Sequence, residues 1–528
     1  MKAGAARLVA GLCLLLLSGC GTQPTDYPLA VGEANPPAPV VDATPDHPLV
    51  VLAISGGGSR AAALGAAIVK RLGDLHYAVG GATRSLATDI AVVSSVSGGS
   101  VYAADLGLNG PAHAAAFMDR IQNYDGLGWL EERALNPGTW VALQLENKTR
   151  VDVLQEMIED LLQTKAAMSA FNQPGKPLVL LNATDMVAGQ IFTFDRDTLD
   201  DLCMNYDQVP VSLGVTASAA FPIAFTPVLL RNDSYLPAGC PGGRNAHLPY
   251  RLPLGVPGGV YANLETYRID RYRQSLRNET VREQGGDGEI APYRTPLYVR
   301  LVDGGVADNS ALTPLRRALL TPGGPADISR MVAQGKLRRL VVIAVNARSD
   351  PPNKLDRSTA YTTVLTMAQA ISGALVDSAS ANSALVFQNF IKLLTGDRDR
   401  LVAAGHTQAN FAGYPISIDF DQLPNATAAQ RQEQQQVKSI ATSWTLQPGD
   451  VALLDRVAGE LLWRHPCFRA LAADIGLEGS PEAAPVPNTR CPVEPPRPVT
   501  PPKATRPQND VAGNAVRLRK IASRGGSP

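Results

Sequence analysis

Two glycine-rich turns, each between an apolar run and a stretch of small residues, constrain the fold of this chain most. The run Pro48–Ile54 predicts a buried strand, Gly56–Arg60 follows it, and Ala61–Leu75 predicts a helix. The pattern recurs where Ile90–Val93 predicts a strand and Ser95–Gly99 forms a turn before another small-residue helix. Repeated strand–turn–helix units build a sheet with helices on both faces. We therefore predict an α/β fold with a three-layer α/β/α sheet.

Three short segments of the chain carry groups that acyl transfer requires. Ser97 lies on a sharp strand-to-helix turn, which exposes a serine hydroxyl. Backbone N–H groups of the Gly56–Arg60 turn can stabilise an oxyanion. Asp303 ends the predicted strand Leu297–Val302 and can accept the proton of a nucleophile. Each segment alone is also compatible with an ordinary tight turn, whereas together they indicate a serine hydrolase.

At these residues the chain resembles the patatin-like phospholipase family. That family has a G-G-G-x-R segment, a G-x-S-x-G elbow and a D-G-A or D-G-G motif in this order. Two further stretches resemble it: Asn182–Phe194 its central strand pair, and Ala217–Pro222 its small-residue helix start before a proline. The elbow departs from the family pattern in beginning with Ser95 instead of Gly, and Ala61 replaces a Gly that often follows the first segment. Neither change removes a catalytic group.

The resemblance implies a role for each residue of these motifs. Ser97 would be the nucleophile and Asp303 its base. The oxyanion hole would be formed by Gly56, Gly57 and Gly58, with Arg60 orienting the loop. The turns that carry the Ser–Asp dyad would depend on four further glycines, namely Gly98, Gly99, Gly304 and Gly305. Asp308 and Asn309 would cap the next helix instead of reacting.

The implied function is a lipid acyl hydrolase of the phospholipase A or lysophospholipase type, which cleaves acyl esters through an acyl-enzyme. One alternative is a Ser-His-Asp esterase in which His406 or His465 completes a triad. Another is a non-catalytic envelope lipoprotein that keeps the fold. The sequence contains no Ca²⁺ loop, P-loop or complete dinucleotide fingerprint, and its cysteine spacing is not that of a zinc site, so we expect no cofactor and no metal.

The N-terminus predicts a secreted, lipid-anchored protein. A short basic start and the apolar run Leu8–Leu17 have the layout of a signal peptide and are too short to span a bilayer. The sequence Leu17-Ser18-Gly19-Cys20 resembles a bacterial lipobox, after which Cys20 would be lipidated; an ordinary signal peptide is the alternative. Because Gly21 follows, resemblance to Gram-negative lipoproteins favours the periplasmic face of the outer membrane.

Charge and cysteine content restrict the partners and the compartment. Lys plus Arg and Asp plus Glu number 48 each, so no net charge indicates nucleic acid, and the expected partner is a membrane phospholipid or another acyl ester. Oligomeric state is left open. Four cysteines lie beyond the predicted lipid site: Cys203, Cys240, Cys467 and Cys491. In an oxidising periplasm they predict two disulfides with three possible connectivities, of which Cys203–Cys240 and Cys467–Cys491 are local in sequence, and four free buried thiols are the alternative.

Composition divides the remaining chain. We expect a signal peptide, a flexible proline-rich tether, a catalytic α/β domain, a helical C-terminal part, and a disordered proline-rich and basic tail. An insertion rich in Pro and Gly interrupts the catalytic domain, either as a lid over the site or as a disordered or structural insert. In chain order, the expected bounds are 1–19 for the signal peptide, 20–48 for the tether, 49–347 for the catalytic domain with its insertion at about 231–292, 348–476 for the helical part, and 477–528 for the tail.

Overall fold

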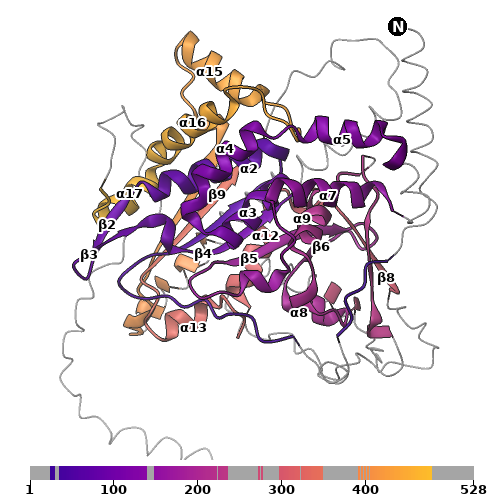
Figure 1. Ribbon diagram of the computed structural model, residues 1–528. Coiled ribbons are helices and arrows are strands. Elements are labelled where there is room, and N and C mark those ends of the chain that lie inside the picture. Colours follow the sequence, from indigo (N-terminus) through magenta and orange to yellow (C-terminus); the bar gives the residue numbers. More distant parts are fainter. Residues whose placement is uncertain are drawn as a thin grey trace, which may run out of the picture. The chain divides into compact units, whose positions relative to one another are not determined.

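The structure, a computed structural model, shows a mixed sheet between two layers of helices (Figure 1). It describes residues 24–29, 35–139, 148–235, 272–276, 296–348, 391–478 and 491, apart from single residues at 223, 274, 322, 393, 397, 400 and 404. The predicted leader, the predicted lipid site Cys20, and most of the expected insertion and tail lie outside these residues.

Eight strands form the main sheet, in the order β10-β9-β1-β4-β5-β8-β7, with β6 also paired to β5. The five strands from β10 to β5 run parallel, whereas β8 is antiparallel to both β5 and β7. Their bounds are β1 (Leu49–Ile54), β4 (Ile90–Val96), β5 (Leu178–Asp185), β6 (Gln190–Thr193), β7 (Val228–Arg231), β8 (Tyr298–Val302), β9 (Arg339–Asn346) and β10 (Ala412–Asp419). A separate hairpin pairs β2 (His76–Val79) with β3 (Ala82–Ser85).

Helices cover both faces, because side chains alternate along each strand. On β1, Val50, Leu52 and Ile54 pack in the apolar core beneath one helical layer, and Leu49 and Val51 belong to the core on the opposite face. The first layer contains α2 (Gly58–Gly73), α3 (Gly98–Asn109), α4 (Ala114–Asn123), α5 (Gly126–Leu135), α7 (Arg150–Leu162), α9 (Val211–Ala219), α16 (Asp450–Arg464) and α17 (Pro466–Ile475). The second contains α12 (Leu312–Leu320) and α13 (Ile328–Ala333). The predicted three-layer α/β/α fold is confirmed.

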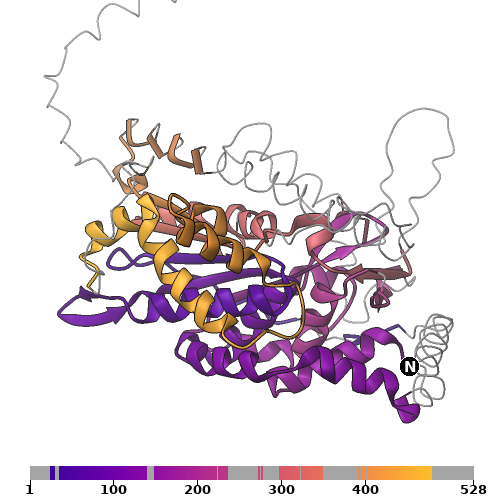
Figure 2. The same ribbon diagram turned by 90° about the horizontal axis from the view of Figure 1, so that it is seen from above.

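The C-terminal part, which was predicted to be helical, also contributes a strand to the sheet. Strand β10 pairs with β9 along its full length, so β9 lies inside the sheet and β10 forms its edge. Helix α16 lies alongside α2 (Figures 1 and 2). All described residues belong to one compact unit, Met1–Pro495, so residue 347 is not a domain boundary. Apolar periodicity shows that an element is buried but not which neighbour buries it.

The prediction of a flexible tether over 20–48 is wrong for the described part of that range. Thr25 N–H donates to Leu229 O at 2.7 Å and Leu29 N–H donates to Cys203 O at 3.0 Å. Farther along, Val41 N–H donates to Pro325 O at 2.8 Å and Ala43 is buried. Prolines favour an extended chain but do not stop its other residues from pairing with a neighbouring strand. The segment therefore lies against the domain.

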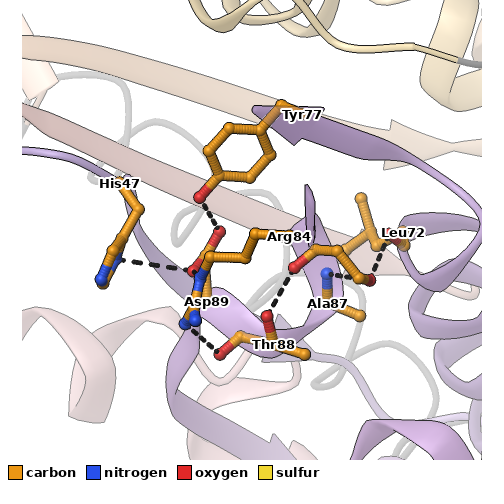
Figure 3. Close-up of polar contacts among 8 residues, drawn as sticks. His47, Leu72, Tyr77, Arg84, Ala87, Thr88 and Asp89 are labelled. Atoms are coloured by element: carbon orange, nitrogen blue, oxygen red, sulfur yellow. Dashed lines mark hydrogen bonds and ion pairs between the residues drawn. The ribbon is translucent and has the colours of Figure 1, made fainter. Parts of the chain in front are cut away.

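A buried carboxylate fixes the end of this segment at the N-terminal edge of the parallel strands (Figure 3). Asp89 accepts hydrogen bonds from Tyr77 Oη at 2.6 Å and Arg84 Nε at 2.5 Å, and His47 Nδ1 lies 3.5 Å from it. Burial raises the pKa of Asp89, and the hydrogen bonds from Tyr77 and Arg84 lower it in part. The cluster joins the N-terminal segment to the β2–β3 hairpin and to the start of β4.

One predicted disulfide is confirmed, and it alters the boundary of the tail. Cys467 is bonded to Cys491, which ties residue 491 to α17. Glu478 N–H also donates to His76 O at 2.7 Å, so the chain is ordered past the predicted boundary at 477. Cys203 is disulfide-bonded as well, and its predicted partner Cys240 lies outside the described residues.

Candidate active site

Ser97 occupies a strained turn between β4 and α3. Its φ is 52°, a left-handed conformation that is uncommon for a residue with a side chain. The Ser97 N–H donates to Ser218 Oγ at 2.9 Å and to Ser218 O at 3.1 Å, and these bonds help to hold the turn. Ser97 is half-buried, while Val96 before it and Gly98 after it are buried. The elbow thus presents one hydroxyl at the surface of an otherwise closed turn.

The structure brings Ser97 and Asp303 together from positions 206 residues apart. Ser97 Oγ donates to Asp303 Oδ2 at 2.7 Å. The other carboxylate oxygen, Oδ1, accepts the Gly305 N–H at 2.8 Å. The main chain is fixed as well, because Asp303 N–H donates to Ala220 O and Gly304 N–H to Ser218 O, each at 3.0 Å. The carboxylate is therefore oriented before any substrate binds.

Two glycines permit the close approach of these turns. A Cβ added to Gly98 would overlap the carbonyl oxygen of Gly58, so the elbow touches the glycine loop that precedes α2. A Cβ added to Gly304 would overlap the carbonyl oxygen of Asn182 on β5. Any side chain at either position would push the turns apart. The glycines of the two motifs are needed for contact between segments.

The glycine loop leaves two backbone donors available. Gly56 N–H donates to Asn309 O at 3.1 Å and is occupied. Among the described residues, neither Gly57 N–H nor Gly58 N–H has an acceptor, and both glycines have positive φ, 145° and 61°. Of the three predicted oxyanion glycines, Gly57 and Gly58 thus keep free N–H groups. The loop also opens α2, whose N-terminus favours negative charge.

Arg60 holds this loop through residues that the sequence did not connect with the site. Its guanidinium is buried and donates from Nε to Ala347 O at 2.8 Å, from Nη2 to Thr442 Oγ1 at 3.1 Å, and from Nη1 to Ile440 O. Burial lowers the pKa of Arg60 to about 10, so the side chain stays charged at neutral pH. Ser59 N–H donates to Ser443 O at 2.8 Å. Residues 440–443 thus cover the loop, and no local motif marks them.

A buried polar network supports the elbow from beneath. Ser218 Oγ donates to Asn182 O at 2.5 Å and lies 2.9 Å from Ser100 Oγ. Ser100 Oγ lies 3.0 Å from Ser95 Oγ, the side chain that replaces the family's glycine, so this serine is accommodated in a hydrogen-bonded chain. The only sequence signal was the small-residue stretch Ala217–Pro222, read as a helix start. It is instead the C-terminal end of α9, where small side chains let the helix reach the elbow.

The two predicted capping residues behave differently. Ala311 is the N-cap residue of α12, but the Asp308 carboxylate supports the first turn of that helix, because its Oδ2 accepts the Thr313 N–H at 2.8 Å. Asn309 lies at the site instead: a Cβ added to Gly56 or to Gly305 would overlap its side-chain oxygen. The prediction that these residues support the next helix thus holds for Asp308, although not as the N-cap, whereas the side-chain oxygen of Asn309 lies beside the glycine loop.

Burial changes the acidity of the proposed base. It raises the pKa of Asp303 to about 6, although the hydrogen bonds from Ser97 and Gly305 lower it in part. A carboxylate with a raised pKa is a stronger base and is still ionised at neutral pH.

The pH dependence follows from this value. Only ionised Asp303 can accept the Ser97 proton, so kcat/KM for a neutral ester should rise about tenfold per pH unit below pH 6 and level off above it. Stopped assays with a short-chain ester between pH 4 and 8 measure the profile, and unfolding monitored at each pH excludes denaturation. A rate that is flat between pH 4.5 and 6 would contradict the assignment of Asp303 as base.

The histidines of the alternative triad lie elsewhere. His465 ends α16 and caps α17; its Nδ1 lies 3.3 Å from Cys467 N and its Nε2 lies 3.3 Å from Ser417 N. Neutral imidazole has one acceptor nitrogen, so one of these two bonds forms at a time. His406 precedes a short 3-10 turn and is exposed. In the described part of the chain, no histidine side chain hydrogen-bonds Ser97 or Asp303.

Metal and membrane-span features can be assessed for the described residues alone. Within them, no group of His, Cys, Asp and Glu side chains is arranged to hold a metal ion. None of the helices described has the length and hydropathy of a bilayer-crossing segment.

The fold and the site define a class: an α/β/α protein with an elbow serine hydrogen-bonded to an aspartate. Residues 52–267 match the family model of the patatin-like phospholipases, so the chain carries a patatin-like phospholipase domain. This match supports lipid hydrolase activity; it includes Ser97 and the glycine loop and ends before Asp303.

Comparison with solved structures finds human GIVD cytosolic phospholipase A2. One structure has 11% identity and a TM-score of 0.35 and covers 78% of this chain and 60% of the other. The same enzyme in complex with methyl gamma-linolenyl fluorophosphonate has 12% identity and a TM-score of 0.36, and covers 81% and 58%. The chain thus spans about three fifths of that enzyme's length, and at these TM-scores the similarity says nothing about substrate. No curated protein matches the chain.

Proposed function

We propose that this protein is a lipid acyl hydrolase of the phospholipase A or lysophospholipase type that uses a Ser97–Asp303 dyad. The observation that carries the proposal is the 2.7 Å hydrogen bond from Ser97 Oγ to Asp303 Oδ2, made by a serine on a positive-φ elbow. A serine hydroxyl is a weak nucleophile until a base accepts its proton, and the buried carboxylate is placed to do so.

The reaction has two steps. In the first, Asp303 takes the proton of Ser97 as Oγ attacks the acyl carbonyl carbon, and the oxyanion forms near the N–H groups of Gly57 and Gly58. The intermediate collapses with loss of the alcohol, which takes the proton from Asp303. In the second, water gives a proton to Asp303 and attacks the acyl-enzyme, and Ser97 leaves with that proton as the fatty acid is released. Removing one oxyanion donor typically raises the barrier by about 3 kcal/mol.

We further propose that the enzyme is lipid-anchored through Cys20 to the bacterial outer membrane, on the periplasmic side. The lipobox-like sequence Leu17–Cys20 supports this, and the disulfide Cys467–Cys491 is compatible with an oxidising compartment.

Hydrolysis of a phospholipid panel by the purified full chain, with histidine variants beside it, tests the proposed activity and its mechanism. We expect fatty acid release by the natural chain, and His406→Gln and His465→Gln should each keep kcat within about threefold, because neither imidazole handles a proton. His465→Gln should lower stability by about 1 kcal/mol through loss of its helix cap.

A Ser-His-Asp triad would instead lose about 10⁴-fold in kcat when its histidine base is removed. A loss of that size in one histidine variant, with normal thermal unfolding, would support the Ser-His-Asp alternative. Failure of the natural chain to hydrolyse any ester would favour a non-catalytic protein.

A further inference from the structure

An exposed apolar surface lies where β8 meets the turn between β5 and β6. Four large apolar side chains are exposed there: Met186 (51%), Val187 (75%), Leu297 (48%) and Tyr298 (40%). They are half of the eight exposed large apolar side chains in the part of the chain that the structure describes. Single exposed apolar residues are normal in soluble proteins, but a cluster indicates contact with another apolar surface.

A backbone hydrogen bond joins the two segments that carry these side chains. Met186 N–H donates to Arg300 O at 2.9 Å, which joins the β5–β6 turn to β8. Along β8, Tyr298 and Arg300 are exposed while Val299 between them is buried, so the two share one face. We call the surface made by Met186, Val187, Leu297, Tyr298 and Arg300 the β8 surface.

The β8 surface lies at the edge of the sheet that carries the active site. Asn182 on β5 pairs with Val96 on β4, which is the residue before Ser97. Met186 lies four residues beyond Asn182, in the direction in which both parallel strands run. Because β8 is antiparallel to β5, Tyr298 lies in that direction too, five residues from Asp303. At about 3.3 Å per residue, the surface is roughly 13 to 17 Å beyond the dyad.

The described N-terminal segment limits how far the predicted lipid anchor can lie from this edge of the sheet. Thr25 pairs with Leu230 on β7, which is hydrogen-bonded to β8, and Arg231 N–H donates to Thr25 O at 3.1 Å. Cys20 is five residues before Thr25. A fully extended chain of five residues spans at most about 17 Å. A lipid on Cys20 would therefore be attached no more than about 17 Å from Thr25, which pairs with β7.

The exposed apolar surface and the short distance from Thr25 to the predicted lipid site both indicate the same partner. We propose that the β8 surface rests on the bilayer that holds the Cys20 anchor, so that the dyad faces phospholipids of the enzyme's own membrane. This inference rests on the proposed function. The apolar side chains match the acyl boundary, and the exposed Arg300 matches the phosphate groups. Residues 236–295, which connect β7 to β8, are the competing occupant.

Site-specific fluorescence distinguishes these occupants. The full acylated chain, with Val187→Cys or the matched control Val40→Cys, is labelled with an environment-sensitive nitrobenzoxadiazole group and reconstituted in phosphatidylethanolamine–phosphatidylglycerol vesicles. Val40 is 60% exposed and lines a cavity with Leu49 and Ile90, the first residues of β1 and β4, so it lies at the opposite edge of the sheet. We expect the label at 187 to shift to the blue with lipid and to be quenched by spin-labelled lipid, and the label at 40 to do neither. Equal behaviour of the two labels, or blue emission at 187 without lipid, would overturn the proposal, the latter because the chain itself would cover the surface.

Rates on a vesicle substrate and on a soluble substrate, measured for two variants, test this proposal separately from the hydrolase assignment. Val187→Glu should lower hydrolysis of vesicle phospholipid about tenfold, since a tenfold loss needs only a modest change in binding free energy. It should leave hydrolysis of a soluble short-chain ester unchanged, and Val40→Glu should leave both rates unchanged. Loss of vesicle activity in both variants or in neither would refute the membrane orientation. Absence of all hydrolysis in the natural chain would refute the proposed function, while the fluorescence would still report the orientation.

Discussion

Replacing Ser97 with alanine should lower kcat toward acyl esters by about 10⁴-fold or more, because it removes the proposed nucleophile. The substitution removes one half-buried hydroxyl and its 2.7 Å bond to Asp303, and it leaves the N–H bonds of the elbow to Ser218 in place. Hydrolysis of a short-chain ester, with thermal unfolding of the same sample, measures the effect.

A matched serine makes this result specific. Ser169 donates a 3.2 Å hydrogen bond from Oγ to Asp207 O in a short 3-10 turn, and neither residue belongs to the site. Ser169→Ala should therefore hydrolyse the ester at the natural rate. If Ser97→Ala keeps more than about a hundredth of the natural kcat with an unchanged melting temperature, Ser97 is not the nucleophile.

Asp303→Asn should reduce kcat to within about tenfold of the Ser97→Ala value. The amide keeps the size of the carboxylate and can still accept one hydrogen bond, but it cannot take a proton from Ser97. Because the buried carboxylate has a pKa raised to about 6, removing its charge should not lower stability much. Pre-steady-state kinetics should show no burst of released alcohol, since acylation itself needs the base.

Asp327 provides the matched control for a buried aspartate. Its carboxylate caps α13 by accepting the Ser329 N–H at 2.9 Å and lies outside the site. Asp327→Asn should keep kcat and lose about 1 kcal/mol of stability at most, since Asn is also a good cap. A normal acylation burst in Asp303→Asn would contradict its role as base and would require another group to accept the proton.

Local sequence patterns were enough to predict the elements and the chemical groups that lie close together along the chain. Continuous apolar runs, each followed by a glycine-rich turn, predicted β1, β4 and β8 to within a few residues, because each strand's apolar content reflects its own burial. The glycine loop and the serine elbow were visible for the same reason: their backbone requirements are local. Asp303 could be named as the partner of Ser97 through its motif, but the sequence contained no measure of the distance between them.

Contacts between segments far apart in the sequence could be seen only in the folded chain. Arg60 is held by Ala347, Ile440 and Thr442, which lie about 290 to 380 residues farther along the chain and carry no motif. Asn309 points to the glycine loop instead of capping a helix, because the turn after Gly305 sets its direction. The N-terminal segment, whose prolines suggested a free tether, pairs with β7 because an edge strand offers unpaired backbone groups. Such pairings depend on which surfaces the fold leaves open, and composition along the chain does not record that.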